Sequence, residues 1–214
     1  MKKLIALMLA AVFCLSIAFT ASAAQEVTVT DKNFVIVEKD YGNYGYLYAR
    51  IENTGDEPLY LENGKMTLTD VNGGIAATSD YVNAYPNYLE PGQVAYAYCY
   101  CSLDVSAADC ADLMFSIKPT DKVYAPTRHF EADAAEVYYD PEETWYPYNA
   151  ICELTNPTED VIFDSGVVYA FYDENDNFLF TEVTWMYNVG RIPGSPLLYQ
   201  VFPDDDIAGQ FTAA

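Results

Sequence analysis

The chain repeats a set of turn and strand-end residues with a period of about 103 residues. The repeated residues lie at offsets of 103, 103, 103 and 102: Asn53 and Asn156, Asp70 and Asp173, Thr78 and Thr181, Pro91-Gly92 and Pro193-Gly194. Solenoid repeats are about 20–50 residues long, so a repeat of this length is a whole small domain. We therefore predict two copies of one fold, over residues 24–118 and 119–214.

Residues 1–23 have the pattern of a secretory signal peptide. Lys2 and Lys3 precede an apolar run, and Ala21-Ser22-Ala23 supplies the small residues of a cleavage site. We expect cleavage before Ala24 and a secreted or extracytoplasmic mature protein. A membrane anchor is the alternative, because the apolar run is almost long enough to span a bilayer. No later segment is as apolar, so we expect no membrane span after cleavage.

The predicted mature chain is strongly acidic. It holds 8 basic and 32 acidic residues, a net charge of −24 over 191 residues. Nucleic acids and anionic membranes are bound by clustered Lys and Arg, so we expect neither as a partner. Most carboxylates are dispersed and are typical of a solvated surface. The run Asp204-Asp205-Asp206 leaves a cation or a basic partner open.

Short β-branched and aromatic runs separated by turn residues fill both halves. Gly, Asn and Pro in the separators provide the backbone angles that tight turns require. Residues 106–112 have the only helical pattern that we identify, and residues 138–148 have the composition of a linker. Strands at this spacing are typical of β-sandwiches. We predict an all-β protein of two tandem immunoglobulin-like β-sandwich domains.

Three short patterns resemble a known family. A strand ends in Asn53-Thr54-Gly55, residues 169–173 read Tyr-Ala-Phe-Tyr-Asp, and Pro91-Gly92 recurs as Pro193-Gly194. These patterns resemble the FxLYD family of bacterial exported immunoglobulin-like domains, over most of both repeats. The resemblance implies a bacterial protein associated with the cell envelope and without catalytic activity. Met66 and Thr69 depart from the pattern in the first copy.

Alternation along two strands predicts which side chains face the core. Gln200 should face water, which places the aligned Tyr98 outside and Ala97 and Cys99 inside. If the two strands pair, five tyrosines share one exposed sheet face: Tyr46, Tyr48, Tyr96, Tyr98 and Tyr100. Such a face stabilises the sheet, is covered by the second domain, or binds a protein, peptide or glycan.

Four cysteines remain after cleavage. Cys152 lies at a core position and is expected to be buried and unpaired. Cys101 and Cys110 flank a short loop and are the candidate disulfide, although free thiols are equally open. A metal site is disfavoured, because no histidine is near and the spacing fits no zinc module. Residues 173–177 resemble the start of a calcium loop, but the ligands of its later positions are missing, so a hairpin turn is expected.

No catalytic motif is present, and we predict neither an enzyme nor a cofactor. His129 lies in a Pro- and charge-rich connector and is expected at the surface. The favoured function is a secreted bacterial binding or envelope-associated module whose partner is a protein, peptide or glycan. The alternative is an exported inhibitor or chaperone-like partner of another secreted protein that adds an edge strand to its target. A structural spacer is third.

Overall fold

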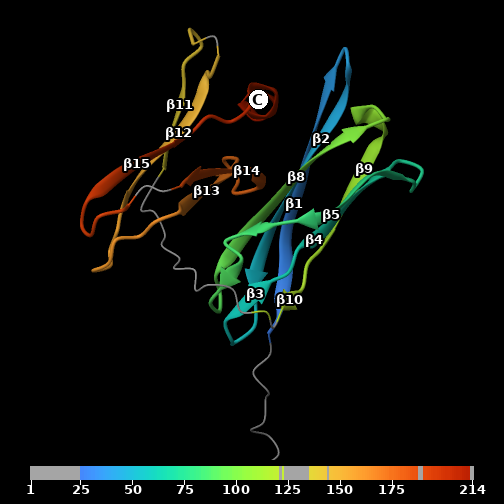
Figure 1. Ribbon diagram of the computed structural model, residues 1–214. Coiled ribbons are helices and arrows are strands. Elements are labelled where there is room, and N and C mark those ends of the chain that lie inside the picture. The colour runs from blue at the N-terminus through green and yellow to red at the C-terminus, as the bar shows by residue number, and fades with distance from the viewer. Residues whose placement is uncertain (1–24, 121, 123–134, 144, 188–189, 213–214) are drawn as a thin grey trace, which may run out of the picture.

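The computed structural model describes residues 25–120, 122, 135–143, 145–187 and 190–212. It confirms the all-β class, since antiparallel sheets account for nearly all of the described regular structure. The sheets form two groups that lie side by side, one built from residues 25–120 and the other from residues 135–212 (Figure 1). The predicted signal peptide and His129 lie outside the described residues.

The first half packs two main sheets around one core. The larger sheet has the order β1 (Val27–Lys39), β2 (Gly42–Asn53), β8 (Val94–Leu103) and β6 (Ala84–Tyr85). The facing sheet has the order β5 (Ile75–Val82), β4 (Gly64–Asp70) and β9 (Cys110–Ser116). A small third sheet joins β10 (Pro119–Thr120), β3 (Leu59–Leu61) and β7 (Tyr88–Leu89), and the 3₁₀ turn η1 (Ala107–Asp109) precedes β9. All three sheets contribute to a single buried apolar cluster.

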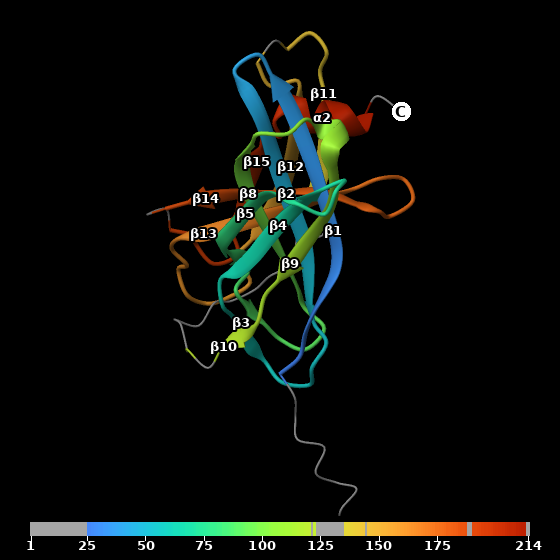
Figure 2. The same ribbon diagram turned by 90° about the vertical axis from the view of Figure 1, so that its right-hand side faces the viewer.

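The described part of the second half has fewer strands than the first half, and it contains a helix. One sheet has the order β11 (Ala135–Tyr139), β12 (Tyr148–Thr155) and β15 (Pro196–Val201). β13 (Ser165–Tyr172) and β14 (Phe178–Met186) form the other sheet, and α2 (Asp205–Thr212) follows β15. The linker prediction for residues 138–148 is partly wrong, because β11 pairs with β12 over five residues up to Tyr139. In both views α2 lies beside the far end of the β1–β2 hairpin (Figure 1, Figure 2).

The repeated asparagines make matching hydrogen bonds in the two halves. Asn53 Nδ2 donates to the carbonyls of Glu57 (2.9 Å) and Leu89 (3.1 Å), and Asn53 Oδ1 accepts from Gly55 N (3.0 Å). The main-chain carbonyl of Asn53 accepts from Gly92 N at 2.8 Å. One buried side chain therefore joins the end of β2 to the loop that follows it and to β7.

Asn156 makes the same four bonds in the second half. Its Nδ2 donates to the carbonyls of Asp160 (2.7 Å) and Arg191 (2.8 Å), and its Oδ1 accepts from Thr158 N (2.9 Å). Its carbonyl accepts from Gly194 N at 3.0 Å. Gly92 and Gly194 have φ of +78° and +71°, a left-handed conformation that glycine adopts without strain. These geometric requirements explain why Asn and Pro-Gly recur in the sequence.

The repeated aspartates close equivalent hairpins. Asp70 Oδ1 accepts from the amides of Asn72 (2.7 Å) and Gly74 (2.8 Å). Asp173 Oδ1 accepts from the amides of Asn175 and Asn177, both at 2.8 Å. The predicted hairpin turn at residues 173–177 is therefore confirmed.

The two halves differ in the element that comes after their last shared strand. In the first half β8 leads into β9, which pairs with β4. In the second half β15 leads into α2, and the described residues place no strand beside β13 other than β14. This difference leaves α2 free to pack between the halves.

Candidate functional site

The predicted pairing of the two tyrosine-bearing strands is confirmed. β2 and β8 are antiparallel neighbours, with Tyr46 opposite Tyr100 and Tyr48 opposite Tyr98. Of the two predicted inward residues, Ala97 is fully buried and Cys99 is half-buried. The positions that alternate in the same way are also fully buried: Leu47, Ala49, Ile51 and Ala95. The alternation of small and large residues therefore identified the core face of this sheet correctly.

The opposite face is not the exposed surface that the sequence predicted, and this is a correction. Tyr48 is 2% exposed, and Tyr46 and Tyr96 are half-buried. Tyr98 and Tyr100 are 40% and 55% exposed. The second half covers part of this face, which is the alternative that the alternation pattern left open.

Aromatic side chains of β14 make the apolar part of this contact. Phe180 lies 6.2 Å from Tyr48 between ring centroids, and Phe178 lies 5.7 Å from Tyr96. Ile207 of α2 belongs to the same buried cluster. Burial of Tyr48 raises the pKa of its phenol well above the usual range, so this ring stays neutral at physiological pH.

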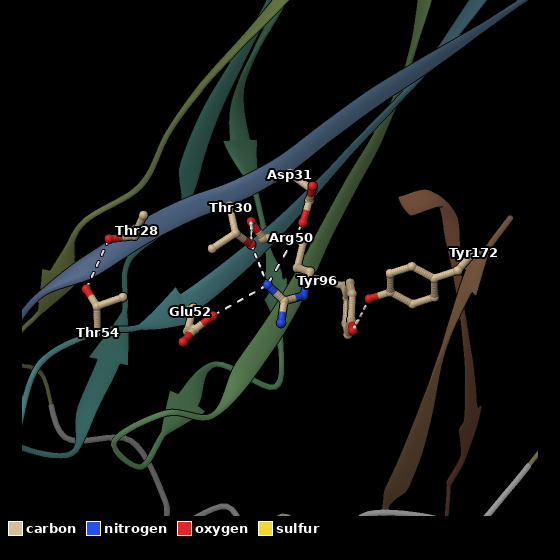
Figure 3. A network of polar contacts seen from close by, with 8 residues as sticks. All are labelled: Thr28, Thr30, Asp31, Arg50, Glu52, Thr54, Tyr96 and Tyr172. Carbon is tan, nitrogen blue, oxygen red and sulfur yellow. Dashed lines mark hydrogen bonds and ion pairs between the residues drawn. The ribbon is translucent and has the colours of Figure 1, made fainter. Parts of the chain in front are cut away.

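Polar side chains also join the halves. The hydroxyls of Tyr96 and Tyr172 are 2.8 Å apart and share a hydrogen bond (Figure 3). Asn33 Nδ2 donates to the carbonyl of Leu179 at 2.7 Å. Both contacts connect strands of the first half to the β13–β14 hairpin, so they fix its position on the β1–β2–β8 sheet.

Arg50 lies beside Tyr96 in the first half, and its Nη1 has three polar partners. Its Nη1 donates to Thr30 Oγ1 at 2.7 Å and lies 3.9 Å from Asp31 Oδ2 and 3.5 Å from Glu52 Oε2 (Figure 3). The side chain of Arg50 is 24% exposed. These partners make Arg50 a structural residue rather than a ligand-binding cation.

A groove of about 640 Å³ opens between the halves, beside the covered tyrosines. Four aromatic side chains line it: Tyr46, Trp145, Tyr146 and Phe202. Four carboxylates also line it: Glu182, Asp204, Asp205 and Asp206. Lys39 is the basic residue of the lining, and its ammonium is paired with Asp206. The groove therefore combines aromatic surface with an excess of negative charge.

The aromatic rim is open to solvent. Trp145 is 78% exposed, Tyr146 is 58% exposed, and the rings of Tyr146 and Phe202 lie 4.9 Å apart. The same three side chains line an adjoining hollow of about 330 Å³, to which Asn149 contributes. Asn149 Oδ1 is buried and has no hydrogen-bond partner among the described residues. A buried acceptor without a partner is costly, so a donor supplied by a ligand would be favourable here.

Glu182 is the most perturbed acid of the groove. Its burial, reinforced by the nearby charge of Asp204, raises its pKa from the usual 4.5 to about 7. Tyr46 is affected in the same way, and burial raises the pKa of its phenol to about 12. A carboxylate that ionises only near neutrality would gain from an approaching cation, because the cation offsets its loss of hydration.

The three consecutive aspartates occupy the start of α2. Asp204 Oδ1 accepts from Asp206 N at 2.9 Å, and the Asp204 carbonyl accepts from the amides of Ile207 and Ala208. Asp204 is thus the N-cap, and Asp205 and Asp206 lie in the first turn, where acidic side chains complement the helix dipole. This helix was not predicted from the sequence, although Asp-Asp-Asp before an apolar residue is a helix-start pattern.

The two exposed tyrosines each contact other aromatic rings of the first half. Tyr100 stacks on Tyr44 with 5.3 Å between ring centroids and meets Tyr46 edge-on at 5.2 Å. Tyr98 lies near Tyr85 at 6.4 Å. Tyr46 is therefore the residue of the predicted five that reaches the groove, while Tyr98 and Tyr100 lie elsewhere on the face.

The four described cysteines are free, including Cys101 and Cys110. Cys101 Sγ donates to the carbonyl of Gly45 at 3.4 Å, and Cys110 Sγ to that of Ser106 at 3.6 Å. The candidate Cys101–Cys110 disulfide is thus not formed in the structure. Cys152 is 3% exposed and unpaired, as predicted. The described residues contain no group of three or more acidic, Cys or His side chains placed to hold a metal ion.

Comparison with known proteins yields no relative. The chain matches no protein-family model, no curated protein and no solved structure. The resemblance to FxLYD domains and the immunoglobulin-like topology stay predictions. In the part of the chain that the structure describes, no helix has the length and apolar character needed to cross a membrane.

Proposed function

We propose that this chain is a non-catalytic, exported bacterial binding protein that holds a cationic side chain of a partner peptide in the groove between its halves. The observation that carries the proposal is the groove lining, in which open aromatic rings stand beside four carboxylates. Aromatic faces attract Lys and Arg side chains, and carboxylates supply the opposite charge.

The charge balance of the groove favours a cation over other ligands. Lys39 is already paired with Asp206, so Glu182, Asp204 and Asp205 leave an excess of negative charge. An anionic ligand would be repelled. The partnerless Asn149 Oδ1 in the adjoining hollow accepts a hydrogen bond and so favours an N–H donor, which both Lys and Arg provide.

The proposal is tested with a trilysine peptide titrated by calorimetry at low ionic strength, with triglutamate as the charge-reversed control. Binding of trilysine should strengthen as pH rises from 6 to 8, because Glu182 loses its proton with a pKa of about 7 and the carboxylate then attracts the ammonium. Triglutamate should not bind.

A matched pair of variants locates the site. Glu182→Gln should weaken trilysine binding about tenfold at pH 8 and remove its pH dependence. Glu174→Gln makes the same change at an exposed carboxylate on the β13–β14 turn and should alter binding less than about twofold. Equal losses in the two variants would mean that trilysine binds the acidic surface at large, and the groove proposal would then be wrong.

A further inference from the structure

β13 lies at the edge of its sheet, whereas the corresponding strand of the first half, β4, lies in the interior of its sheet. β4 lies between β5 and β9, whereas β13 pairs with β14 and with no other strand of the described residues (Figure 1). The correspondence is residue by residue, since Thr181 Oγ1 donates to the Tyr169 carbonyl as Thr78 Oγ1 donates to the Met66 carbonyl. The strand that pairs with β4 on that side, β9, therefore indicates what kind of strand can pair with the free edge of β13.

The direction of the backbone groups on this edge is set by the same contact. The Tyr169 carbonyl points toward β14, because it accepts from Thr181 Oγ1 at 2.8 Å. Backbone groups of successive residues in an antiparallel strand point alternately to either side. Those of Val168 and Ala170 consequently face away from β14. They form an N–H and C=O ladder that a further strand can pair with.

The sequence of β13 lacks the usual protection of an edge strand. Residues 165–172 include no charged residue and no proline, and β-branched and aromatic residues predominate. β4, which is interior, carries Lys65 and Asp70. Natural edge strands are usually blocked by charge, proline or a covering element, since an open apolar edge pairs with other chains. β13 does carry a register shift at Phe171/Tyr172, which leaves residues 165–171 in regular pairing.

Charge identifies what kind of strand would pair there. Residues 135–212 contain fifteen carboxylates and one basic residue, Arg191, which is 8% exposed. A second copy of this chain would bring the same negative charge and be repelled. A segment carrying Lys or Arg is attracted.

We propose that the free edge of β13 accepts an extended, cationic strand of a partner protein, in the antiparallel register that β9 adopts on β4. In that register a large apolar residue, like Leu113 of β9, lies opposite Phe171. This edge is separate from the groove, whose lining contains no residue of β13.

The register also predicts a size preference. In the first half the ring of Phe115 packs against Gly64, where an added Cβ would lie 2.4 Å from the ring. The residue 103 positions later is Val167, which is buried. A partner strand therefore needs a small residue at the place of Phe115, because the valine side chain occupies the space of that ring.

The probe is a synthetic peptide of residues 110–116 with Cys110→Ser, Asp112→Lys and Phe115→Ala, and two lysines added at each end. Two N-methylated forms make the test specific for strand pairing. The Asp112 carbonyl accepts from Thr69 Oγ1 and so faces β4, whereas the Leu113 carbonyl accepts from Lys32 Nζ and faces away. By alternation the Met114 N–H faces β4 and the Leu113 N–H does not.

Methylation at Met114 should weaken binding of the labelled peptide at least about tenfold, and methylation at Leu113 should change it less than about twofold. Retaining Phe115 in the peptide should weaken binding. In the protein, Val168→Pro should weaken binding about tenfold. It should do so equally in the Glu182→Gln background, where cation binding in the groove is weakened, and this separates the edge from the groove. Equal effects of the two methyl groups, or no binding of the unmethylated peptide at millimolar concentration, would overturn the proposal even where trilysine binds.

Discussion

The two halves of the molecule share their turns and differ in their edges. Asn53 and Asn156 join equivalent loops with equivalent bonds, and Asp70 and Asp173 close equivalent hairpins. After the last shared strand, however, the first half adds β9 and the second adds α2. The turn residues are therefore determined by local backbone geometry in both halves. The element after the last shared strand is not, since it is a strand in one half and a helix in the other.

The helix that follows β15 contributes to the groove. Among the described residues, fifteen are buried in the core of the first half, whereas six form the core of the second half alone. Part of the apolar surface of the second half is instead buried against the first, through Phe178, Phe180 and Ile207. The helix that packs there also brings Asp204, Asp205 and Asp206 to the groove. The second half thus has a helix where the first half has β9, and this helix lines the candidate binding site.

The largest expected effect tests whether the second half covers the tyrosine face in solution. Tyr48 and Tyr98 are cross-strand neighbours, but Tyr48 is 2% exposed and Tyr98 is 40% exposed. Tyr48→Ser should lower the free energy of unfolding by about 4 kcal/mol, because a large aromatic side chain is removed from a buried cluster.

Tyr98→Ser is the control and should cost less than about 1 kcal/mol. Urea denaturation followed by circular dichroism measures both variants. Similar small losses would show that Tyr48 is exposed in solution and that the two halves do not pack together.

The second prediction compares the repeated asparagines. Asn53→Ala and Asn156→Ala should each lower the free energy of unfolding by about 3 kcal/mol, because each leaves two carbonyls and one amide without their partner. Asn175→Ala, at an exposed turn position, should cost less than about 0.5 kcal/mol. If only one of these two substitutions lowered the free energy of unfolding strongly, the two asparagines would not stabilise their halves equally.

The sequence was sufficient for features that depend on local chemistry. The Ala-Tyr alternation of β8 identified its core face, and Asp173 identified a hairpin, because strand period and turn geometry involve neighbouring residues. The sequence was not sufficient to predict the burial of Tyr48. Alternation shows that a side chain faces away from the core of its own sheet pair, but not whether another unit covers it.

The groove was beyond sequence reasoning for the same reason. Tyr46, Trp145 and Glu182 are far apart in the chain and meet only because the halves pack together. α2 was missed despite its Asp204 cap, since Gly209 and Thr212 are weak helix formers and most of its stability comes from burial of Ile207 and Ala208.

The third prediction concerns Glu182, whose counterpart 103 positions earlier is Ser79. The folded-state pKa of Glu182, about 7, lies above its usual value of 4.5. Its contribution to stability is therefore fully present below pH 4.5 and is lost as pH rises through 7. Glu182→Gln should match the parent chain at pH 4 and be about 2 kcal/mol more stable at pH 8.

Thermal or urea unfolding at several pH values measures this difference, with Glu174→Gln as the exposed control. A variant curve parallel to that of the parent chain would mean that Glu182 is solvated, and the electrostatic basis of the groove proposal would be lost. The titratable groups that face Glu182 are Asp204, Tyr46, Tyr48 and Tyr98. Burial raises the pKa of each of these three tyrosines, so their phenols stay neutral up to pH 8.

The smallest expected effect is the energetic coupling between the halves through a single hydrogen bond. The hydroxyls of Tyr96 and Tyr172 are 2.8 Å apart, and Tyr172 is 40% exposed, so water competes for this bond. Tyr96→Phe and Tyr172→Phe should each cost about 0.5–1 kcal/mol, and the double variant should cost about 0.5 kcal/mol less than the sum of the single losses. Phenylalanine keeps both rings in place, so the difference reports on the hydrogen bond rather than on packing.

Tyr98→Phe combined with Tyr172→Phe provides the control, because no hydrogen bond joins Tyr98 to Tyr172, and these losses should be additive. Additive losses for Tyr96 and Tyr172 as well would show that this bond does not contribute in solution, and the halves would then be held together by the apolar contacts of β14 and α2 alone.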